Sequence, residues 1–332
     1  MTAVEAGRGR AGGERPAATT QVLVLAGGLS AEREVSLQSG RGVVSALAEV
    51  GVDAGVADVG ADLLDVVRRH APDVVWPVLH GAGGEDGTLP QVLELLRVPF
   101  VGSPSGAARL AWDKTAAAEV AARAGAAVPP SVTLPQSLVR DVGPARLLPL
   151  VAERIPGPVV VKPVHGGSSL GVGVVHDPGD LPHAMVSALG HDSQCRVERF
   201  VPGTEVAVTV VDDGGGPVAA PAVEIAPDSG AYDYGSRYTA GATVFHCPAR
   251  LPDDVAQRLL AQAVAVHVAL GLGHLSRSDW IVDADGRAWF LEVNTSPGMT
   301  GTSLVPQALQ EQGGAAAVYA RLVAAAGASS AG

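Results

Sequence analysis

The chain has 332 residues, of which 47% are hydrophobic, and it carries a formal net charge of −11. A chain of this length and apolar content can bury more than one packed layer, so we expect a globular protein with two or three subdomains. The acidic balance argues against a nucleic-acid partner, because such proteins present a basic surface to phosphates. We therefore expect a small-molecule partner and no nucleic acid.

The cysteines and the N-terminal residues indicate where the protein works. Cys195 and Cys247 lie far apart, with no second cysteine or histidine at metal-ligand spacing, which fits a reducing compartment. Residues 1–20 are rich in Gly, Ala and Arg but lack the continuous apolar core of a signal peptide or membrane span. We predict a disordered tail, a cytoplasmic location and no membrane partner.

The first hundred residues follow an α/β pattern. The apolar run 21–26 ends in two glycines, and residues 34–50 then have the pattern of a helix. A second buried strand over 74–79 is followed by the loop 80–87 and by a helix from Leu89. Glycines and carboxylates follow both strands, which suggests that these loops contact a ligand.

Two further segments follow, with a boundary expected near residue 113 and another near residue 201. The elements predicted in them are a helix over 111–125, a strand over 158–164, a strand over 205–211 and a helix over 253–270. Two closing strands complete the chain, and there is no internal repeat.

These closing strands, 278–282 and 288–293, are joined by a turn that begins at Asp283, a pattern typical of a β-hairpin. A register with Val282 opposite Arg287 places Arg277 opposite Glu292 and Asp279 opposite Phe290. Because side chains alternate along a strand, one face then collects Arg277, Asp279, Glu292 and Asn294. Two carboxylates and an amide favour Mg²⁺ shared with substrate phosphates, although a solvated face with an Arg–Glu pair fits the pattern equally well.

A buried strand that carries Lys162 is followed by the glycine-rich loop HGGSSLG from His165. Backbone N–H groups of such a loop can surround phosphate oxygens, while the lysine supplies a point charge. The order differs from that of a Walker A motif, in which the lysine follows the glycines. Only Lys114 and Lys162 are lysines among the 23 basic residues, so either these positions resist arginine or the count reflects chance.

Glu198 and Glu205 flank the junction of the second and third segments. Carboxylates and backbone groups at such a hinge can bind an adenine and a ribose, although an exposed pair of glutamates is the commoner explanation. The junction alone leaves both readings open.

Together these residues resemble the D-alanine–D-alanine ligase family of the ATP-grasp superfamily, from about residue 21 to residue 325. The matching stretches are GGLSAEREVS from Gly27, HGAGGEDGT from His80, WDK from Trp112, VKPVHGGSSLGV from Val161, YDYGSRY from Tyr232, and LEVNTSPGMT from Leu291 with Ser303 and Leu304 after it. The resemblance implies an α/β (α+β) chain with the ATP-grasp fold. The implied organisation is a disordered tail over 1–20, an N-terminal substrate-binding α/β domain over 21–113, a central ATP-binding subdomain over 114–200, a C-terminal catalytic ATP-grasp subdomain over 201–327 and a tail over 328–332.

The resemblance implies ATP and two Mg²⁺ (or Mn²⁺) ions as cofactors. Lysines would contact the ATP phosphates, and residues of the hinge would hold adenine and ribose. The implied ATP-binding residues are Lys114, Lys162, Ser169, Glu198, Val201, Glu205 and Arg237. The implied metal ligands are Asp279, Glu292 and Asn294.

In this family, ATP phosphorylates the carboxylate of a first D-alanine, and the amine of a second D-alanine attacks the acyl phosphate. The resemblance places Arg277 and the Gly298 N–H at the oxyanion, Glu32 at the first ammonium group with His80 beside it, and Ser303 with the Leu304 N–H at the second carboxylate. Ser168 and Tyr238 would join Glu32 in a hydrogen-bonded set beneath a loop that closes against water. Taken singly, Glu32 is also explained as a helix cap, His80 as a loop histidine and Ser168 as support for a glycine turn.

Four positions depart from the usual family pattern, namely Arg237 for Lys, Thr302 for His, Gly166 for Glu and Ser278 for an apolar residue. Arg237 keeps the charge but changes the geometry of its donors. The alternatives are a related ligase with another acceptor such as D-serine or D-lactate, an inactive ATP-binding module, and a binding protein with two α/β lobes. Because members of the family are commonly homodimers, we also expect a homodimer.

Overall fold

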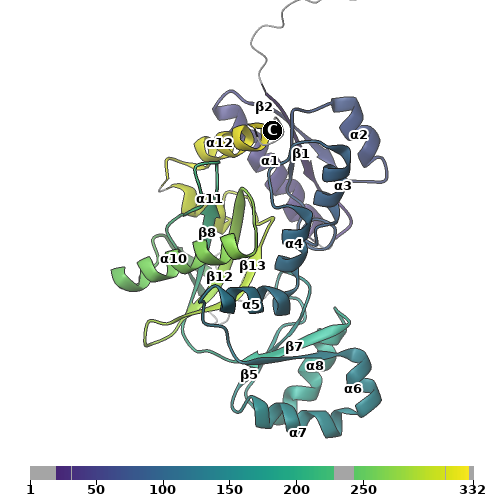
Figure 1. Ribbon diagram of the computed structural model, residues 1–332, viewed down its shortest axis with the longest axis vertical. Helices are drawn as coiled ribbons and strands as arrows, with labels where there is room; N and C mark the ends of the chain where they lie inside the picture. Colours follow the sequence, from purple (N-terminus) through teal and green to yellow (C-terminus); the bar gives the residue numbers. More distant parts are fainter. Residues whose placement is uncertain (1–19, 31, 228–242, 311, 329–332) are drawn as a thin grey trace, which may run out of the picture.

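Three β-sheets with flanking helices build the molecule, and the computed structural model describes residues 20–30, 32–227, 243–310 and 312–328. Figure 1 shows the sheets distributed along the longest axis, with the N-terminal segment at the top, the C-terminal sheet in the middle and the central segment at the bottom. Within these ranges, none of the helices combines the length and apolarity needed to cross a membrane.

The N-terminal lobe is an α/β unit with a parallel sheet in the order β2-β1-β3. Its elements are β1 (Gln21–Ala26), α1 (Arg33–Glu49), β2 (Asp53–Asp58), α2 (Leu63–His70), β3 (Val74–Pro77) and α3 (Thr88–Leu96). β1 is buried from Val22 onward, because helices cover both faces of the sheet. Leu23 and Leu25 pack toward α2 and α3, while Val22 and Val24 pack toward α1 and the C-terminal helix α12 (Ala315–Ala328).

Two short helices come next, α4 (Ser105–Trp112) and α5 (Lys114–Arg123), where the sequence predicted one helix over 111–125. Asp113 separates them with an extended backbone, and its carboxylate accepts hydrogen bonds from the N–H groups two and three residues further on, at 2.8 and 3.0 Å. An aspartate in this position satisfies donors that a helix start leaves unpaired, so a new helix begins there. α5 then packs against the C-terminal sheet.

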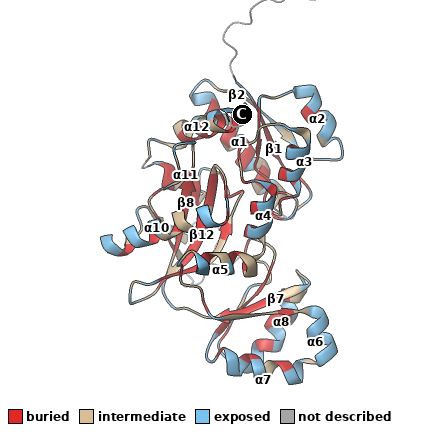
Figure 2. Ribbon diagram, viewed as in Figure 1, coloured by how far each residue is buried: buried red, intermediate tan, exposed pale blue. Residues whose placement is uncertain are grey.

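The central lobe consists of an antiparallel sheet in the order β4-β7-β5-β6 and the helices packed on it. Its elements are β4 (Ser131–Pro135), α6 (Gln136–Val142), α7 (Pro144–Arg154), β5 (Val159–Pro163), β6 (Gly173–Val175), a 3-10 turn η1 (Pro178–Asp180), α8 (Leu181–Leu189) and β7 (Gln194–Arg199). Leu134, Val161, Leu181 and Val197 belong to a hydrophobic cluster formed within this lobe. Figure 2 shows buried strands here and exposed outer sides on α6 and α7.

The C-terminal sheet has six strands in the order β11-β10-β8-β12-β13, with β9 paired to β8. The elements are β8 (Thr204–Val211), β9 (Val218–Ala219), β10 (Val223–Pro227), β11 (Thr243–His246), α10 (Asp253–Ala269), β12 (Leu275–Val282), β13 (Ala288–Asn294) and α11 (Leu304–Gln310). On β12, Trp280 and Val282 pack beneath α10, whereas Leu275 joins the core shared with the N-terminal lobe. By alternation, Arg277 and Asp279 lie on the same face as Leu275, toward the other lobes.

Candidate active site

The acidic hairpin formed by β12 and β13 has a different register from the predicted one. The observed pairs are Val282 with Ala288, Trp280 with Phe290, Asp279 with Glu292, and Arg277 with Asn294. A bulge beside Asp279 shifts the register by one residue, so the predicted pairs of Arg277 with Glu292 and Asp279 with Phe290 were wrong. The predicted register was already wrong by one residue near the turn, where Val282 pairs with Ala288, and the bulge adds a second residue. Because this total shift is even, the same four polar side chains still share one face.

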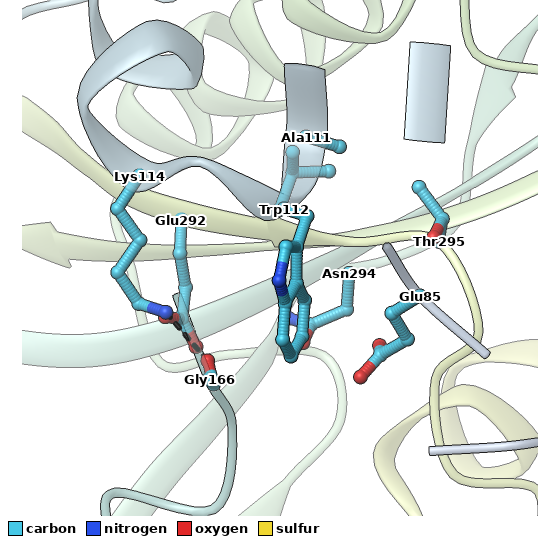
Figure 3. A pocket seen from close by; sticks show the side chains of 9 residues that line it. Glu85, Ala111, Trp112, Lys114, Gly166, Glu292, Asn294 and Thr295 are labelled. Atoms are coloured by element: carbon cyan, nitrogen blue, oxygen red, sulfur yellow. Dashed lines mark hydrogen bonds and ion pairs between the residues drawn. The ribbon is translucent and has the colours of Figure 1, made fainter. Parts of the chain in front are cut away.

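The two strand carboxylates of the hairpin, Asp279 and Glu292, each have a cationic partner. Arg277 donates two hydrogen bonds to Asp279, from Nε at 2.8 Å and from Nη2 at 2.9 Å, and Asn294 Nδ2 lies 3.4 Å from the same carboxylate. Lys114 Nζ lies 3.3 Å from Glu292 Oε2 and donates to the Gly166 carbonyl at 2.6 Å. Figure 3 shows Lys114 and Glu292 pointing toward one another beside Gly166, so α5, β13 and the glycine loop meet at this point.

The donor set of the hairpin fits a hard divalent cation shared with a phosphate. Asp279, Glu292 and Asn294 bring two carboxylates and one amide to the same face. Within the described residues, no three or more His, Cys, Asp or Glu side chains are placed to hold a metal ion together, so the two carboxylates of the hairpin need further ligands to complete a coordination shell. Mg²⁺ commonly takes one or two carboxylates and completes its shell with water and phosphate oxygens.

Lys162 lies in a buried network of charges on the central sheet. Its Nζ is 2.6 Å from Glu198 Oε1, and Arg196 Nε donates to Glu198 Oε2 at 2.9 Å. All three side chains are nearly inaccessible to water. β5 and β7 bring them together, since Lys162 lies opposite Arg196 and Glu198 opposite Val160. Two cations around one carboxylate leave the network with a net positive charge, which favours a nearby anion.

The glycine loop contacts the N-terminal lobe through Ser168, whose hydroxyl donates a hydrogen bond to Glu32 Oε1. Ser168 and Ser169 both have φ above 50°, in the left-handed region, which turns the loop sharply. A Cβ added at Gly81 would lie 2.8 Å from Glu32 Oε2, so the loop after β3 also closes on this carboxylate. Glu32 thus lies where three loops meet.

His80 is buried, and both of its ring nitrogens have protein partners. Nδ1 donates to the Ser296 carbonyl at 2.8 Å, and Nε2 lies 3.0 Å from Ser39 Oγ. Burial lowers the pKa of His80, because desolvation disfavours the imidazolium form. A neutral ring that donates from Nδ1 and accepts at Nε2 satisfies this set of partners.

The residues predicted to bind the second carboxylate, Ser303 and Leu304, lie at the start of α11. Ser303 Oγ accepts from the Thr300 N–H at 3.1 Å and lies 2.8 Å from the Thr300 hydroxyl. A Cβ at Gly298 would approach Ser303 Oγ to 2.8 Å, so the glycine permits close packing of the two segments. Leu304 is the first residue of α11 and is buried, and its N–H belongs to the helix N-terminus, where a carboxylate is favoured.

The predicted hinge residues lie where the chain passes from the central sheet to the C-terminal sheet, with Glu198 on β7. Val201 follows β7, and Glu205 lies on β8 opposite both Ile225 and Ile281. Ser169 lines a pocket together with both lysines and Glu292. Arg237 and Tyr238 lie outside the described residues, so their predicted roles stay predictions.

Glu85 is a candidate site residue that was not predicted from the sequence. It lines one pocket with Trp112, Lys114, Glu292 and Asn294, and Figure 3 shows its side chain on the far side of Trp112 from Lys114. Burial raises its pKa to about 8, although a hydrogen bond from the Gly81 N–H works in the opposite direction. The carboxylates in the loop after β3 were the only sequence signal for it.

Ser39 and Arg196 were also missed. Ser39 is fully buried and contacts His80, and Arg196 is buried against Glu198. Both lie inside regular elements, a helix and a strand, where periodicity explains them as ordinary side chains. The partner of Ser39 is distant in sequence, and no local motif marks that contact. Arg196 and Glu198 are two residues apart on β7, so the alternation of side chains along a strand was the one local signal for their pairing.

Comparison with known proteins gives a consistent result. The family model described as the D-ala D-ala ligase C-terminus matches residues 120–325, and the one for the N-terminus matches residues 64–103. A D-alanine–D-alanine ligase of Geobacter sulfurreducens is 45% identical over 296 residues, which cover 89% of this chain and 90% of the relative. A D-alanine–D-alanine ligase of Bordetella pertussis is 40% identical over 293 residues, covering 88% of this chain and 90% of that protein.

Solved structures give the same fold. The VanG D-Ala:D-Ser ligase of Enterococcus faecalis superposes with a TM-score of 0.80 at 28% identity, covering 93% of this chain and all of that chain. The D-alanine–D-alanine ligase of Bacillus anthracis gives a TM-score of 0.79 at 26% identity, with 94% and 99% coverage. The predicted α/β ATP-grasp fold is confirmed, and the chain belongs to the D-alanine–D-alanine ligase family.

Proposed function

We propose that this protein is an ATP-dependent D-alanine–D-alanine ligase that joins two D-alanines through a D-alanyl phosphate and releases ADP and phosphate. The observation that carries the proposal is the meeting of three structures at Lys114, namely the acidic hairpin through Glu292, helix α5 and the glycine loop through Gly166. This arrangement brings oxygen donors of the kind that bind Mg²⁺, together with cations, to one place in the fold. Relatives at 40 to 45% identity that carry the ligase name support D-alanine as the substrate.

ATP binds in this proposal between the central and C-terminal sheets. Lys114 and Lys162 place positive charge at its phosphates, and the N–H groups of the loop around Ser169 surround the phosphate oxygens. Glu198, Val201 and Glu205 hold the adenine and ribose, and Arg237 adds a cation from the segment after β10. Because Glu198 already accepts from Arg196, it retains a partner when Lys162 turns toward a phosphate.

In the first step, the carboxylate of one D-alanine attacks the terminal phosphate of ATP. Glu32 binds the ammonium group of this D-alanine, and its hydrogen bond to Ser168 fixes it against the glycine loop. Asp279, Glu292 and Asn294 would hold two Mg²⁺ ions, which neutralise the charge on the phosphates. Arg277 stabilises the negative oxygen of the reacting carboxyl group.

In the second step, the amine of another D-alanine attacks the acyl phosphate, and phosphate leaves. Arg277 and the Gly298 N–H donate to the oxygen that becomes negative in the tetrahedral intermediate. Ser303 and the Leu304 N–H bind the carboxylate of the incoming D-alanine at the start of α11. Tyr238, with Ser168 and Glu32, closes the site against water, which would otherwise hydrolyse the acyl phosphate.

The product is proposed to serve peptidoglycan precursor synthesis in the cytoplasm, and the active form is proposed to be a homodimer. Sedimentation of the purified protein measures its mass in solution and so tests the proposed homodimer. A mass near one chain would contradict it.

The reaction is tested by mixing purified protein with MgATP and, separately, D-alanine, L-alanine, D-serine or D-lactate. We expect phosphate release that depends on both Mg²⁺ and D-alanine, and a product with the mass of D-alanyl-D-alanine. Formation of AMP and pyrophosphate would exclude the acyl-phosphate route. Equal use of D-serine or D-lactate as acceptor would assign the chain to a related ligase instead.

A further inference from the structure

The turn that carries Gly298 is held at both ends by a buried pair of side chains. Ser39 Oγ, on α1, accepts a hydrogen bond from the Met299 N–H at 3.1 Å. His80 Nδ1, on the loop after β3, donates to the Ser296 carbonyl at 2.8 Å. Ser39 and His80 are also hydrogen-bonded to each other at 3.0 Å. Two elements of the N-terminal lobe therefore fix the backbone on either side of Gly298.

The hydrogen-bond directions in this pair, the Ser39–His80 clamp, are consistent with one another. A carbonyl only accepts, so His80 carries its proton on Nδ1, and Nε2 accepts the proton of the Ser39 hydroxyl. The Ser39 oxygen remains an acceptor for the Met299 N–H. Ser39 is fully buried and His80 is 6% exposed, so water does not compete for these bonds.

Packing around the clamp leaves the turn little room to shift. A Cβ added to Gly42, one helical turn after Ser39, would lie 2.7 Å from the Met299 carbonyl oxygen. Helix α1 therefore touches the turn directly. On its other side, Gly298 packs closely against Ser303.

We infer that Ser39 is a positioning residue of the ligase reaction, which acts through His80 and Met299 to set the Gly298 N–H in place for the oxyanion. The inference rests on the proposed function, which assigns that N–H its role. A donor of this kind contributes only where it meets the developing charge, and a misplacement of about 1 Å can cost about a hundredfold in rate. Ser39 itself contacts no reacting atom in this arrangement.

The contact is tested directly in protein labelled with ¹⁵N-methionine. The chain has three methionines, Met1, Met185 and Met299, so the Met299 amide is easily assigned and Met185 in the central lobe serves as an internal reference. Ser39→Ala should move the Met299 signal and accelerate its hydrogen exchange, while Met185 stays unchanged. An unchanged Met299 signal would overturn the clamp.

The catalytic role is tested by kinetics and by binding of a phosphinate analogue of the dipeptide, whose tetrahedral phosphorus imitates the intermediate. Ser39→Ala should lower kcat by about tenfold to a hundredfold and should raise the dissociation constant of the analogue by a similar factor. The KM for ATP should change less than about twofold. The matched control is Ser276→Ala. Ser276 is also buried, and its hydroxyl lies 2.8 Å from Nδ1 of a histidine, His267. It lies on the face of β12 that points away from Arg277. The control should keep kcat within about twofold.

Other outcomes separate the two proposals. A wild type that makes no D-alanyl-D-alanine removes the proposed function and, with it, this role for Ser39. An active wild type with an equally active Ser39→Ala, or with an analogue bound equally by both, overturns the role of Ser39 alone. If the alanine variant fails to fold, Ser39→Cys keeps the size of the side chain and replaces the hydroxyl by a weak donor, and the same criteria apply to it.

Discussion

The two sides of the site are built on different kinds of support. The acidic hairpin lies on a sheet whose core is shared with the N-terminal lobe, through residues such as Val24, Leu275 and Leu322. The glycine loop extends from a smaller sheet with a hydrophobic cluster within its own lobe. The glycine loop makes polar contacts with elements packed on the acidic side. Its Gly166 carbonyl accepts from Lys114 of α5, and its Ser168 donates to Glu32 of the N-terminal lobe. A firmly supported acidic side and a separately folded glycine loop would allow the proposed site to admit ATP and then close over it.

The largest expected effect comes from removing charge on the acidic side. Glu292→Gln keeps the shape of the side chain but weakens its attraction to Lys114 and to a cation, so kcat should fall by about a thousandfold. Phosphate release at saturating MgATP and D-alanine measures this. Glu224→Gln changes a buried glutamate of the same sheet, paired with Arg250, and should leave turnover nearly intact. Near-normal activity of Glu292→Gln would mean that the metal residues are misassigned.

Matched core substitutions test whether the two sides fold separately. Leu181→Ala in the central lobe and Leu322→Ala in the shared core should each lower the free energy of unfolding by about 2–5 kcal/mol. Hydrogen exchange should increase only in the central lobe for Leu181→Ala, but in both the N-terminal and C-terminal lobes for Leu322→Ala. Increased exchange across the whole chain in both variants would refute the comparison.

Ser168→Ala removes a hydrogen bond that connects the two sides. Without it, Glu32 loses its link to the glycine loop, and we expect kcat to fall by about tenfold while the melting temperature changes little. Ser193→Ala, on the same lobe but bonded to Asp192, provides the control. A wild-type rate for Ser168→Ala would show that closure does not depend on this contact.

The most gradual expected effect is a pH dependence of stability from Glu85. Its pKa is about 8 in the folded chain and has its ordinary value near 4.5 when unfolded, so the folded state binds the extra proton between these values. Stability should therefore fall as pH rises from about 5 to 8, by roughly 1 kcal/mol per pH unit at most. Urea unfolding over this range measures the slope. In Glu85→Gln the side chain is neutral at every pH, so the free energy of unfolding should change less with pH. An unchanged slope in this variant would assign the pH dependence of stability to another group.

Most of the strands and helices that the sequence predicted are present in the structure, because apolar runs and helical periodicity are local signals. Others, such as α2, α6 and α7, were not predicted. The break between α4 and α5 was also missed, although the signal was present, since Asp113 is a favourable residue for starting a helix. The hairpin shows another limit. Its pairs were wrong by two residues at the site, yet the polar face was predicted correctly, because strand side chains alternate with a period of two.

Contacts over long sequence distances could not be predicted in this way. Ser39 is 41 residues from His80 and 260 from Met299, and nothing local to Ser39 indicates either partner. Glu85 gains its unusual pKa only when the surrounding lobes exclude water from it. The family resemblance supplied predicted roles for residues expected to contact substrates, but it did not indicate side chains such as Ser39 that hold them in place.

The packing of α12 against α1 has a consequence for how the chain is made on the ribosome. One face of the N-terminal sheet is covered by α2 and α3, which follow soon after β1, but the other face needs Leu322 and its neighbours near the end of the chain. At about 5–20 residues per second, roughly 15–60 seconds pass between the synthesis of β1 and that of α12. During this interval Val22 and Val24 lack part of their final cover, so the nascent chain presents an apolar surface to which a chaperone can bind.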